Sequence, residues 1–354
     1  MSCADSVLPA LEARPPSGIK IAVFGSGSFG TALGSVLAAN GHSVVLHSRS
    51  EEVTESINTS HLNPKYLCGF QLPANLWATC DITEALTGAN YILHSVPAQA
   101  SLEFLRTHKE AINSIAPGAP IISVSKGLAV ETGMVMKDVF LHALGTTEQE
   151  RPLAFLSGPS FAKEVMQRFP TGVVVASHDQ QLAMAVQKLF SSTTLRVYTS
   201  NDVIGVELAG ALKNIYAIAA GIVSGCGLGY NSVTGMVTRG LNEMKQLIIA
   251  MGGQEQTISG LAGVGDLMLT CFGTLSRNRS VGLRLGQGEK LADIIASMNE
   301  VAEGVPTTAV ALKISLEKGL DLPIIAVVNR VIAGELVPRD ALIELMTRPL
   351  RSEF

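Results

Sequence analysis

Cysteine is scarce in this chain of 354 residues, and its few copies are scattered. Their number is odd, they stand far apart, and none forms a Cys-x-x-Cys pair. They therefore predict neither a disulfide framework nor a zinc site, and they favour a reducing compartment. We expect no bound metal. The five are Cys3, Cys68, Cys80, Cys226 and Cys271.

Charge is also sparse, since charged residues make up 16% of the chain and the net charge is -4. No positive excess attracts nucleic acid or anionic lipid, so we expect neither as a partner. No apolar run is long and uninterrupted enough to cross a bilayer, because Lys213, Asn214 and several glycines interrupt the segment from Leu208. Residues 1–17 lack the basic start and apolar core of a secretory signal, which predicts a flexible tail.

Apolar sequence is plentiful, at 47% of the residues, and the length suits about two domains. Strand-like apolar runs alternate with helical segments up to residue 200, which predicts an α/β, Rossmann-like, doubly wound and mainly parallel sheet over residues 18–200. From Asp202 onward helical periodicity dominates, which predicts an all-α domain over residues 201–354. The predicted strands lie within residues 19–25, 42–48, 91–97, 120–127, 153–158, 172–177 and 195–200.

A glycine motif, GSGSFG, follows the first predicted strand and opens a helix. This context indicates a dinucleotide-binding turn, in which Gly25 permits the tight bend, Gly27 lets the backbone approach a pyrophosphate, and Gly30 lets helix and strand pack closely. The free N–H groups and the positive helix end favour that anion. The alternative is a glycine-rich turn without a ligand. The candidate cofactor-binding residues are Gly25, Ser26, Gly27, Ser28, Phe29 and Gly30.

The second predicted strand leaves the choice between NAD and NADP open. An acidic residue at its tip would bind the ribose 2′-hydroxyl of NAD, but the chain continues His47-Ser48-Arg49-Ser50-Glu51. Glu51 is a weak candidate for that role. Arg49 suits the adenine or a 2′-phosphate, and the alternative is an exposed arginine without a ligand.

Ligands of doubly wound sheets bind outside the carboxyl ends of the strands. Lys126 ends one predicted strand, where it would overlook the position of a nicotinamide; the alternative is a solvated charge. Ser95 and Pro97 end another strand. The run from Gly158 follows a strand and opens a helix, so Ser160 offers a hydroxyl to a ligand or serves only as a helix N-cap.

The segment 208–221 predicts a buried helix with Lys213 and Asn214 in its middle. Residues one turn from Lys213 are mostly small, so the helix offers an opening where a ligand could meet the ammonium. Desolvation lowers the pKa of a buried lysine and a carboxylate such as Asp266 raises it, so the balance favours a proton acceptor near neutrality. The alternative is a lysine whose stem covers apolar surface while its ammonium reaches water.

A second polar feature of the helical half is the run SRNRS. Arg277 and Asn278 could together bind a small phosphate, the guanidinium supplying paired charged donors and the amide a further one. The alternative is a solvated, arginine-rich turn.

Six motifs follow one another along the chain: GSGSFGTALG, SVSKGL, SGPSFAKE, GVELAGALKNIYAIAAG, AGVGDLMLTC and SRNRSVG. In their order and approximate spacing, and over nearly its whole length, the chain resembles the soluble, nicotinamide-dependent glycerol-3-phosphate dehydrogenases, and it is closer to the bacterial-type branch that trypanosomatids also carry. The resemblance implies reversible interconversion of sn-glycerol 3-phosphate and dihydroxyacetone phosphate with NAD, or alternatively NADP, by a homodimer.

The resemblance also implies roles for single residues, with Lys213 as the general acid/base and Lys126 and Asp266 beside it in catalysis. The implied substrate-binding residues are Lys126, Asn214, Thr270, Arg277, Asn278 and Ser160. The implied cofactor-binding residues outside the glycine motif are Arg49, Ser95, Pro97, Lys126, Ala162, Arg277, Val301 and Glu303.

Two other functions compete with this interpretation. One is a different dehydrogenase of the same build with Cys271 as a nucleophile, although a buried packing residue is the simpler reading of that cysteine. The other is a protein that senses the nicotinamide redox state without chemistry. We expect a cytoplasmic location. The alternative is the glycosome or peroxisome, which relatives reach through a C-terminal tripeptide, but this chain ends Arg-Ser-Glu-Phe.

Overall fold

The computed structural model describes residues 18–298, 301–350 and 352–353, so the tail expected over residues 1–17 lies outside the described residues. The chain divides into two compact units. Unit 1 holds the residues up to Val203 except Lys126–Val135, and unit 2 holds Lys126–Val135 and the chain from Ile204. The prediction that Lys126–Val135 belongs to the N-terminal domain is wrong, because in the structure this segment is part of unit 2, where Lys126 pairs with Asp266.

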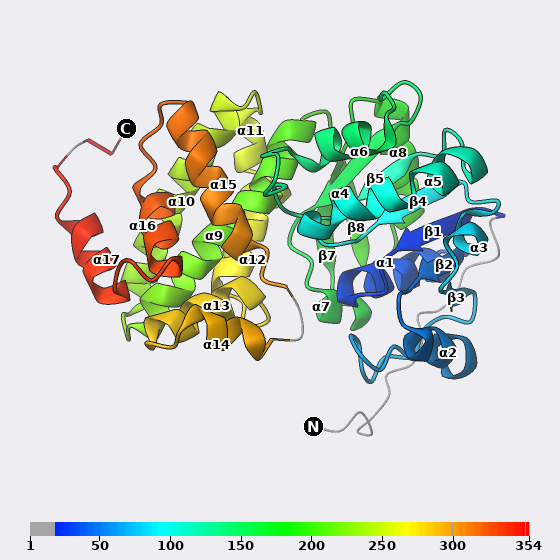
Figure 1. Cartoon of the computed structure of the whole chain (residues 1–354), viewed down its shortest axis with the longest axis horizontal. Coiled ribbons are helices and arrows are strands. Elements are labelled where there is room, and N and C mark those ends of the chain that lie inside the picture. The colour runs from blue at the N-terminus through cyan, green and yellow to red at the C-terminus, as the bar shows by residue number, and fades with distance from the viewer. Residues whose placement is uncertain (1–17, 299–300, 351, 354) are drawn as a thin grey trace. The chain divides into compact units, whose positions relative to one another are not determined.

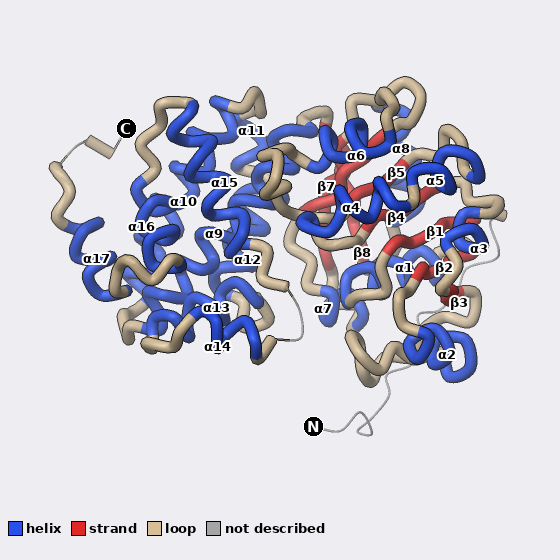
Figure 2. The backbone as a smooth tube through the Cα atoms, in the orientation of Figure 1, coloured by secondary structure: helices blue, strands red, loops and turns tan. Residues whose placement is uncertain are grey.

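Unit 1 is built on one eight-stranded sheet with the order β3-β2-β1-β4-β5-β6-β7-β8 (Figures 1 and 2). All neighbouring strands are parallel except β6 and β7, which confirms the predicted doubly wound, mainly parallel sheet. The strands are β1 Lys20–Phe24, β2 Ser43–His47, β3 Leu76–Thr79, β4 Tyr91–His94, β5 Ile121–Ser123, β6 Leu153–Ser157, β7 Thr171–Ala176 and β8 Leu195–Ser200.

One strand, β3, is missing from the prediction. It has four residues, lies at the edge of the sheet beside β2, and keeps Trp77 partly exposed. A short edge strand needs no continuous apolar run, because it is not covered on both faces along its length. Six of the other seven strands lie within the predicted segments, and β7 begins one residue before its segment, at Thr171.

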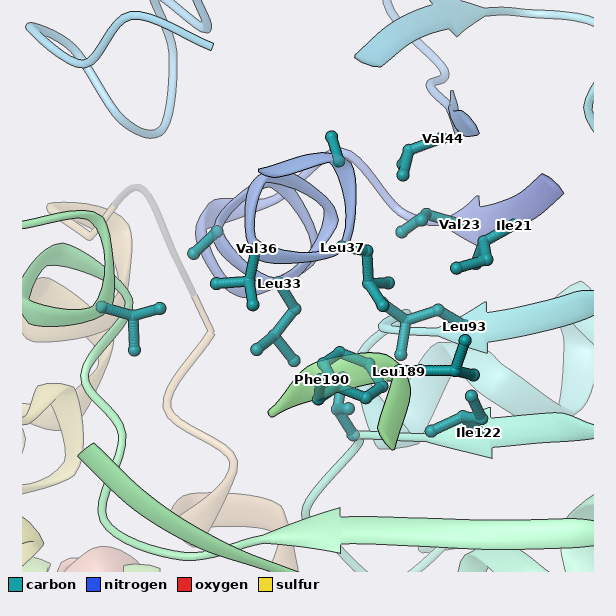
Figure 3. Close-up of a cluster of buried hydrophobic side chains, with 14 of the residues drawn as sticks. Ile21, Val23, Leu33, Val36, Leu37, Val44, Leu93, Ile122, Leu189 and Phe190 are labelled. Atoms are coloured by element: carbon teal, nitrogen blue, oxygen red, sulfur yellow. The ribbon is translucent and has the colours of Figure 1, made fainter. Parts of the chain in front are cut away.

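Helices cover both faces of this sheet (Figure 2). On one face, α1 and α8 pack on β1, β2, β4 and β5 in a cluster that Figure 3 shows, with Leu33, Leu37 and Phe190 among its buried side chains. On the other face, Phe24 of β1 packs on Phe104 of α4, with ring centroids 5.3 Å apart. The helices are α1 Ser28–Ala39, α2 Glu51–Ser60, α3 Ile82–Leu86, α4 Ala98–Thr107, α5 Lys109–Ile115, α6 Met136–Leu144, α7 Ala162–Met166 and α8 Gln180–Phe190.

Within the described residues of unit 2 the regular secondary structure is helical, with Lys126–Val135 added as an irregular segment, and this confirms the predicted all-α domain. A π-helical turn, Leu261–Gly265, precedes α12. The helices are α9 Val203–Gly225, α10 Tyr230–Ala250, α11 Glu255–Ile258, α12 Asp266–Phe272, α13 Arg277–Gly286, α14 Leu291–Ala296, α15 Gly304–Glu317, α16 Pro323–Ile332 and α17 Pro338–Met346.

Helix α9 corrects one expectation of the sequence analysis, because by length and mean hydropathy it is long and apolar enough to cross a membrane. Its most apolar stretch is 89% buried inside the protein, as in the core helix of a globular domain. Among the described residues, one other stretch reaches this length and hydropathy, and only when Glu255–Phe272 and Arg277–Gly286 are counted as one segment bent by 48°.

Helices α9 and α13 pack backbone to backbone through glycines spaced four residues apart. A Cβ atom on Gly282 would overlap the carbonyl oxygen of Ile218, and one on Gly286 would overlap that of Ile222. One turn earlier along both helices, Asn278 hydrogen-bonds Asn214, the neighbour of Lys213. The glycine contact therefore sets the register that brings the start of α13 to the lysine segment of α9.

We predict that Gly282→Ala lowers the free energy of unfolding by about 1–3 kcal/mol, because the added methyl group overpacks the crossing. Urea unfolding followed by circular dichroism measures the change. The control is Gly235→Ala on α10, where a Cβ would meet no atom within 4 Å. That control should gain up to about 1 kcal/mol from helix propensity. Equal stability of the two variants would contradict the close crossing.

Candidate active site

The three glycines of the turn in unit 1 differ in backbone conformation and in the space around their Cα atoms. Gly25 has φ +103°, a backbone conformation that favours glycine, and its N–H donates to the carbonyl of His47 at the tip of β2. A Cβ on Gly30 would overlap the Gly25 carbonyl oxygen and the Ser95 hydroxyl. A Cβ on Gly27 would meet nothing within 4 Å. The fold itself therefore requires Gly25 and Gly30, whereas the missing side chain of Gly27 leaves open space that a pyrophosphate can use.

Buried polar contacts hold this turn in place. The Ser95 hydroxyl donates to the carbonyls of Phe24 and Gly25, at 2.9 and 3.0 Å. The Ser26 hydroxyl donates to Ser48 Oγ at 2.9 Å, and Asn63 Nδ2 donates to the Ser26 carbonyl at 2.9 Å. The turn is thus braced from β4, from the residue after β2, and from the segment that follows α2.

The remaining cofactor candidates of unit 1 lie around this turn or at other strand ends. Ser28 begins α1 and donates its hydroxyl to the Tyr66 carbonyl, and Phe29 packs partly buried against the core. Arg49 is exposed after β2. Pro97 is the N-cap residue of α4. Ala162 begins α7.

Ser160, a substrate candidate, lies in unit 1 between β6 and α7. Its hydroxyl donates to the carbonyl of Gly158 at 2.9 Å. The N-cap residue of α7 is Phe161, without a side-chain cap hydrogen bond, so the alternative role of Ser160 as a helix cap is wrong.

In unit 2 the structure brings the predicted catalytic residues together around one carboxylate. Lys213 Nζ donates to Asp266 Oδ1 at 2.6 Å, and Lys126 Nζ donates to Asp266 Oδ2 at 2.8 Å. Lys213 also donates to Thr270 Oγ1 at 2.8 Å. Lys213 is 7% exposed and Asp266 is 1% exposed, so the cluster is shielded from bulk water. The alternative of a snorkelling Lys213 is therefore wrong.

Burial and neighbouring charges shift the pKa values of both Lys213 and Asp266. Burial lowers the pKa of Lys213, Asp266 partly restores it, and Lys126 lowers it again, so that the pKa is about 8. Burial acts to raise the pKa of Asp266, but the ammonium groups of Lys126 and Lys213 outweigh it and hold that pKa below its usual value. Asp266 therefore stays ionised near neutrality, while Lys213 can be populated in both protonation states.

Local backbone structure explains how Asp266 and Thr270 meet Lys213. The π-helical turn before α12 contains a non-helical residue, Gly263, and Asp266 follows as the first residue of α12. Thr270 lies one turn later and donates its hydroxyl to the Asp266 carbonyl at 2.6 Å. Because its one proton is used there, Thr270 Oγ1 is an acceptor for Lys213.

The amide of Asn278 joins three helices of unit 2. Its Nδ2 donates to Asn214 Oδ1 at 3.0 Å, and its Oδ1 accepts the backbone N–H of Gly304 at 2.9 Å. Both ends of the amide are therefore engaged inside the protein. Arg277 is exposed at the first position of α13, after Ser276, whose side chain caps that helix.

The last two cofactor candidates precede α15. Val301 is 49% exposed, and Glu303 is the N-cap residue of α15. They belong to unit 2, as do Lys126 and Arg277.

Cys271 does not fit the rival role of a nucleophile. It is fully buried, and burial raises the pKa of its thiol to about 12. The thiol stays protonated near neutrality, and a protonated thiol is a poor nucleophile. Within the described part of the chain, no group of three or more His, Cys, Asp or Glu side chains is arranged to hold a metal ion.

Sequence reasoning missed the residues that support the glycine turn. Ser48 and Asn63 contact Ser26 across 22 and 37 residues of sequence. Neither belongs to a spaced motif, and both follow elements as ordinary loop residues. Only the tertiary structure shows that they are buried and aimed at the turn.

Comparison with known proteins covers both units. A family model described as the N-terminus of NAD-dependent glycerol-3-phosphate dehydrogenase matches residues 20–183, and the model of the C-terminus matches residues 202–343. The chain is 48% identical to the chloroplastic glycerol-3-phosphate dehydrogenase [NAD(+)] of Oryza sativa, over 93% of this chain and 74% of that protein. It is 45% identical to the glycerol-3-phosphate dehydrogenase [NAD(P)+] of Myxococcus xanthus, over 94% of this chain and 98% of that protein.

A solved structure agrees with these matches. The crystal structure of glycerol-3-phosphate dehydrogenase from Coxiella burnetii has a TM-score of 0.87 and 36% identity, over 93% of this chain and 99% of that one. The family models, the sequence relatives and the solved structure thus all indicate the same family. The chain belongs to the NAD-dependent glycerol-3-phosphate dehydrogenase family.

Proposed function

We propose that the chain interconverts sn-glycerol 3-phosphate and dihydroxyacetone phosphate reversibly, with NAD(H) as cofactor and NADP(H) as the alternative. The observation that carries the chemistry is the buried cluster of Lys213, Asp266, Lys126 and Thr270, in which the lysine pKa is about 8. A proton donor and acceptor near neutrality is what oxidation of an alcohol and reduction of a ketone require. The homodimer stays a prediction from the resemblance, and the cytoplasmic location stays a prediction from the sequence.

Lys213 Nζ is the atom that holds or moves the proton in this proposal. Two directions around it are fixed by Asp266 Oδ1 and Thr270 Oγ1, which leaves one direction for a lone pair or a third N–H. In oxidation the neutral amine takes the C2 hydroxyl proton while the C2 hydrogen leaves with its electron pair and the C–O bond becomes a carbonyl. In reduction the ammonium polarises that carbonyl and returns the proton.

The nicotinamide, when bound, accepts the hydride in one direction and supplies it in the other. The residues of this chain position the substrate and set the charge around it. Lys126 keeps its own ammonium on Asp266 Oδ2, which holds Asp266 ionised and lowers the pKa of Lys213. Lys126 thereby favours the neutral amine that oxidation needs.

The substrate phosphate is assigned to the start of α13. Arg277 is exposed there, and the first turn of a capped helix offers backbone N–H groups and a positive end to an anion. Asn278 donates one Nδ2 proton to Asn214 and accepts from Gly304, which holds the first turn of α13 in place. An amide nitrogen carries two protons, so the second one keeps the phosphate-binding role that the sequence predicts for this side chain.

The cofactor pyrophosphate is assigned to the open space at Gly27. We predict that Gly27→Ala keeps the melting temperature of the wild type, because the new Cβ meets no protein atom within 4 Å. The methyl group should occupy ligand space and raise the Kd for NADH about tenfold or more, which corresponds to about 1.4 kcal/mol. Fluorescence titration with NADH and a thermal melt measure the two quantities. An unchanged Kd in a folded variant would remove the cofactor from this turn.

Lys213→Met tests the acid/base assignment, since it keeps a long side chain and removes the amine. We predict that kcat for dihydroxyacetone phosphate reduction falls by about 10²–10⁴-fold, while the Kd for NADH stays within twofold. Initial rates with NADH and NADPH in parallel also decide the cofactor preference. The control is Lys245→Met on α10, which removes an exposed lysine paired with Glu255. Turnover in Lys213→Met equal to that of the control would refute the assignment.

The pH dependence follows from the pKa of about 8 for Lys213. Reduction needs the ammonium, so its kcat/KM should fall about tenfold per pH unit above that value; oxidation needs the amine, so its kcat/KM should rise up to it. Profiles from about pH 6 to 10 check both directions. Asp266→Asn removes a negative charge that raises the pKa of Lys213, so both the fall in the reduction profile and the rise in the oxidation profile should move to lower pH. Flat profiles in both directions would contradict the proposed role.

A further inference from the structure

Asn63 is a fully buried polar residue in the segment between α2 and β3. Its side chain makes three hydrogen bonds, to the glycine turn and to residues next to it. Nδ2 donates to the Ser26 carbonyl and to Thr31 Oγ1, both at 2.9 Å. Oδ1 accepts the backbone N–H of Tyr66 at 3.3 Å. Only an amide side chain supplies two donors and an acceptor from one planar group.

The contact with Ser26 controls more than the position of one carbonyl. The Ser26 C=O and the Gly27 N–H belong to the same planar trans peptide, so they point in opposite directions. Whatever fixes the carbonyl also fixes the direction of the N–H. Within the described residues, the Gly27 N–H has no hydrogen-bond acceptor, which leaves it available to a ligand in the space where Gly27 lacks a side chain.

The same segment holds the next residue of the turn. The Ser28 hydroxyl donates to the Tyr66 carbonyl at 3.2 Å, and Asn63 holds the Tyr66 N–H. On its other side, Ser26 donates its hydroxyl to Ser48 Oγ. The Ser26–Gly27 peptide is therefore held from two separate segments. Its carbonyl accepts from Asn63 Nδ2 at 2.9 Å and, more weakly, from Thr31 Oγ1 at 3.2 Å, and Asn63 bonds both the carbonyl and that threonine hydroxyl.

We propose that Asn63 is a positioning residue for the dinucleotide: it fixes the orientation of the Ser26–Gly27 peptide and so presents the Gly27 N–H to the cofactor pyrophosphate. This inference rests on the proposed placement of the cofactor at the glycine turn. Loss of the amide removes the shorter of the two hydrogen bonds to the Ser26 carbonyl and leaves only the one from Thr31 Oγ1, so the peptide is held less firmly and binding then includes the cost of ordering it. The effect belongs to cofactor affinity, while the chemistry at Lys213 is untouched.

The test measures the Kd for NADH by fluorescence titration in Asn63→Ala and Asn63→Asp, with folding checked by circular dichroism. Both variants should raise the Kd about tenfold, as expected for a lost buried hydrogen-bond donor at a site that must be preorganised. At saturating NADH, kcat and the KM for dihydroxyacetone phosphate should stay within twofold of wild type. NADH should also raise the melting temperature of the variants less than that of the wild type.

Asn63→Asp adds a readout that loss of stability alone does not produce. The carboxylate cannot donate to the Ser26 carbonyl, but its protonated form can donate one hydrogen bond. Burial raises the pKa of such a carboxyl, so lowering the pH from 8 to 5.5 protonates part of it. The ratio of the Kd of Asn63→Asp to the Kd of wild type, both measured at the same pH, should therefore fall at least about threefold over this range. If Asn63→Ala does not fold, this ratio alone tests the inference. No improvement would count against the inference.

The control is Asn58→Ala, which removes an asparagine that bonds both backbone groups of Ala78 and does not touch the turn. It should lower the melting temperature and leave the Kd for NADH unchanged. Wild-type affinity in both Asn63 variants, or equal weakening in Asn58→Ala, would overturn the positioning role. If Gly27→Ala also binds NADH normally, the cofactor placement fails as well; if Gly27→Ala alone weakens binding, only the role of Asn63 fails.

Discussion

A single buried carboxylate, Asp266, shared by two ammonium groups, is the interaction on which unit 2 depends. A buried charge without a partner costs several kcal/mol, which applies to Asp266 and Lys213, whereas the side chain of Lys126 is 17% exposed. Asp266 uses one oxygen for Lys213 and the other for Lys126, so neither oxygen is left unpaired. The pair of lysines keeps the acid ionised, and burial of Lys213, which Asp266 opposes and Lys126 reinforces, lowers its pKa to about 8. The charges that pair inside unit 2 are thus the same three to which proton transfer is assigned in the proposed function.

The packing of the helices makes this charge cluster possible. Lys213 lies in the middle of an apolar helix that contacts α13 through glycines, so the backbones approach closely and little room remains for water. The same register pairs Asn214 with Asn278. A core built from larger side chains would separate α9 from α13 and break this amide contact at the start of α13, where the phosphate is assigned.

Local pattern was sufficient for much of this structure. Buried strands have continuous apolar runs, and the glycine turn and the lysine in an apolar helix are visible as exceptions in sequence. What the sequence could not reveal depends on distant contacts. Lys126–Val135 follows a strand of unit 1 but belongs to unit 2, β3 is a short edge strand, and Asn63 bonds a residue 37 positions away. In each case the deciding partner lies outside any local window.

The glycine turn shows how the demands of the fold and of the ligand can be separated. A side chain at Gly30 would collide with the Gly25 carbonyl oxygen, just after β1, and with the Ser95 hydroxyl. Gly25 itself has a positive φ, so the fold alone accounts for both glycines. Neither reason applies to Gly27. Four polar contacts nevertheless hold its neighbours Ser26 and Ser28. These contacts do not fill the space beside Gly27, and the pyrophosphate site proposed there accounts for them.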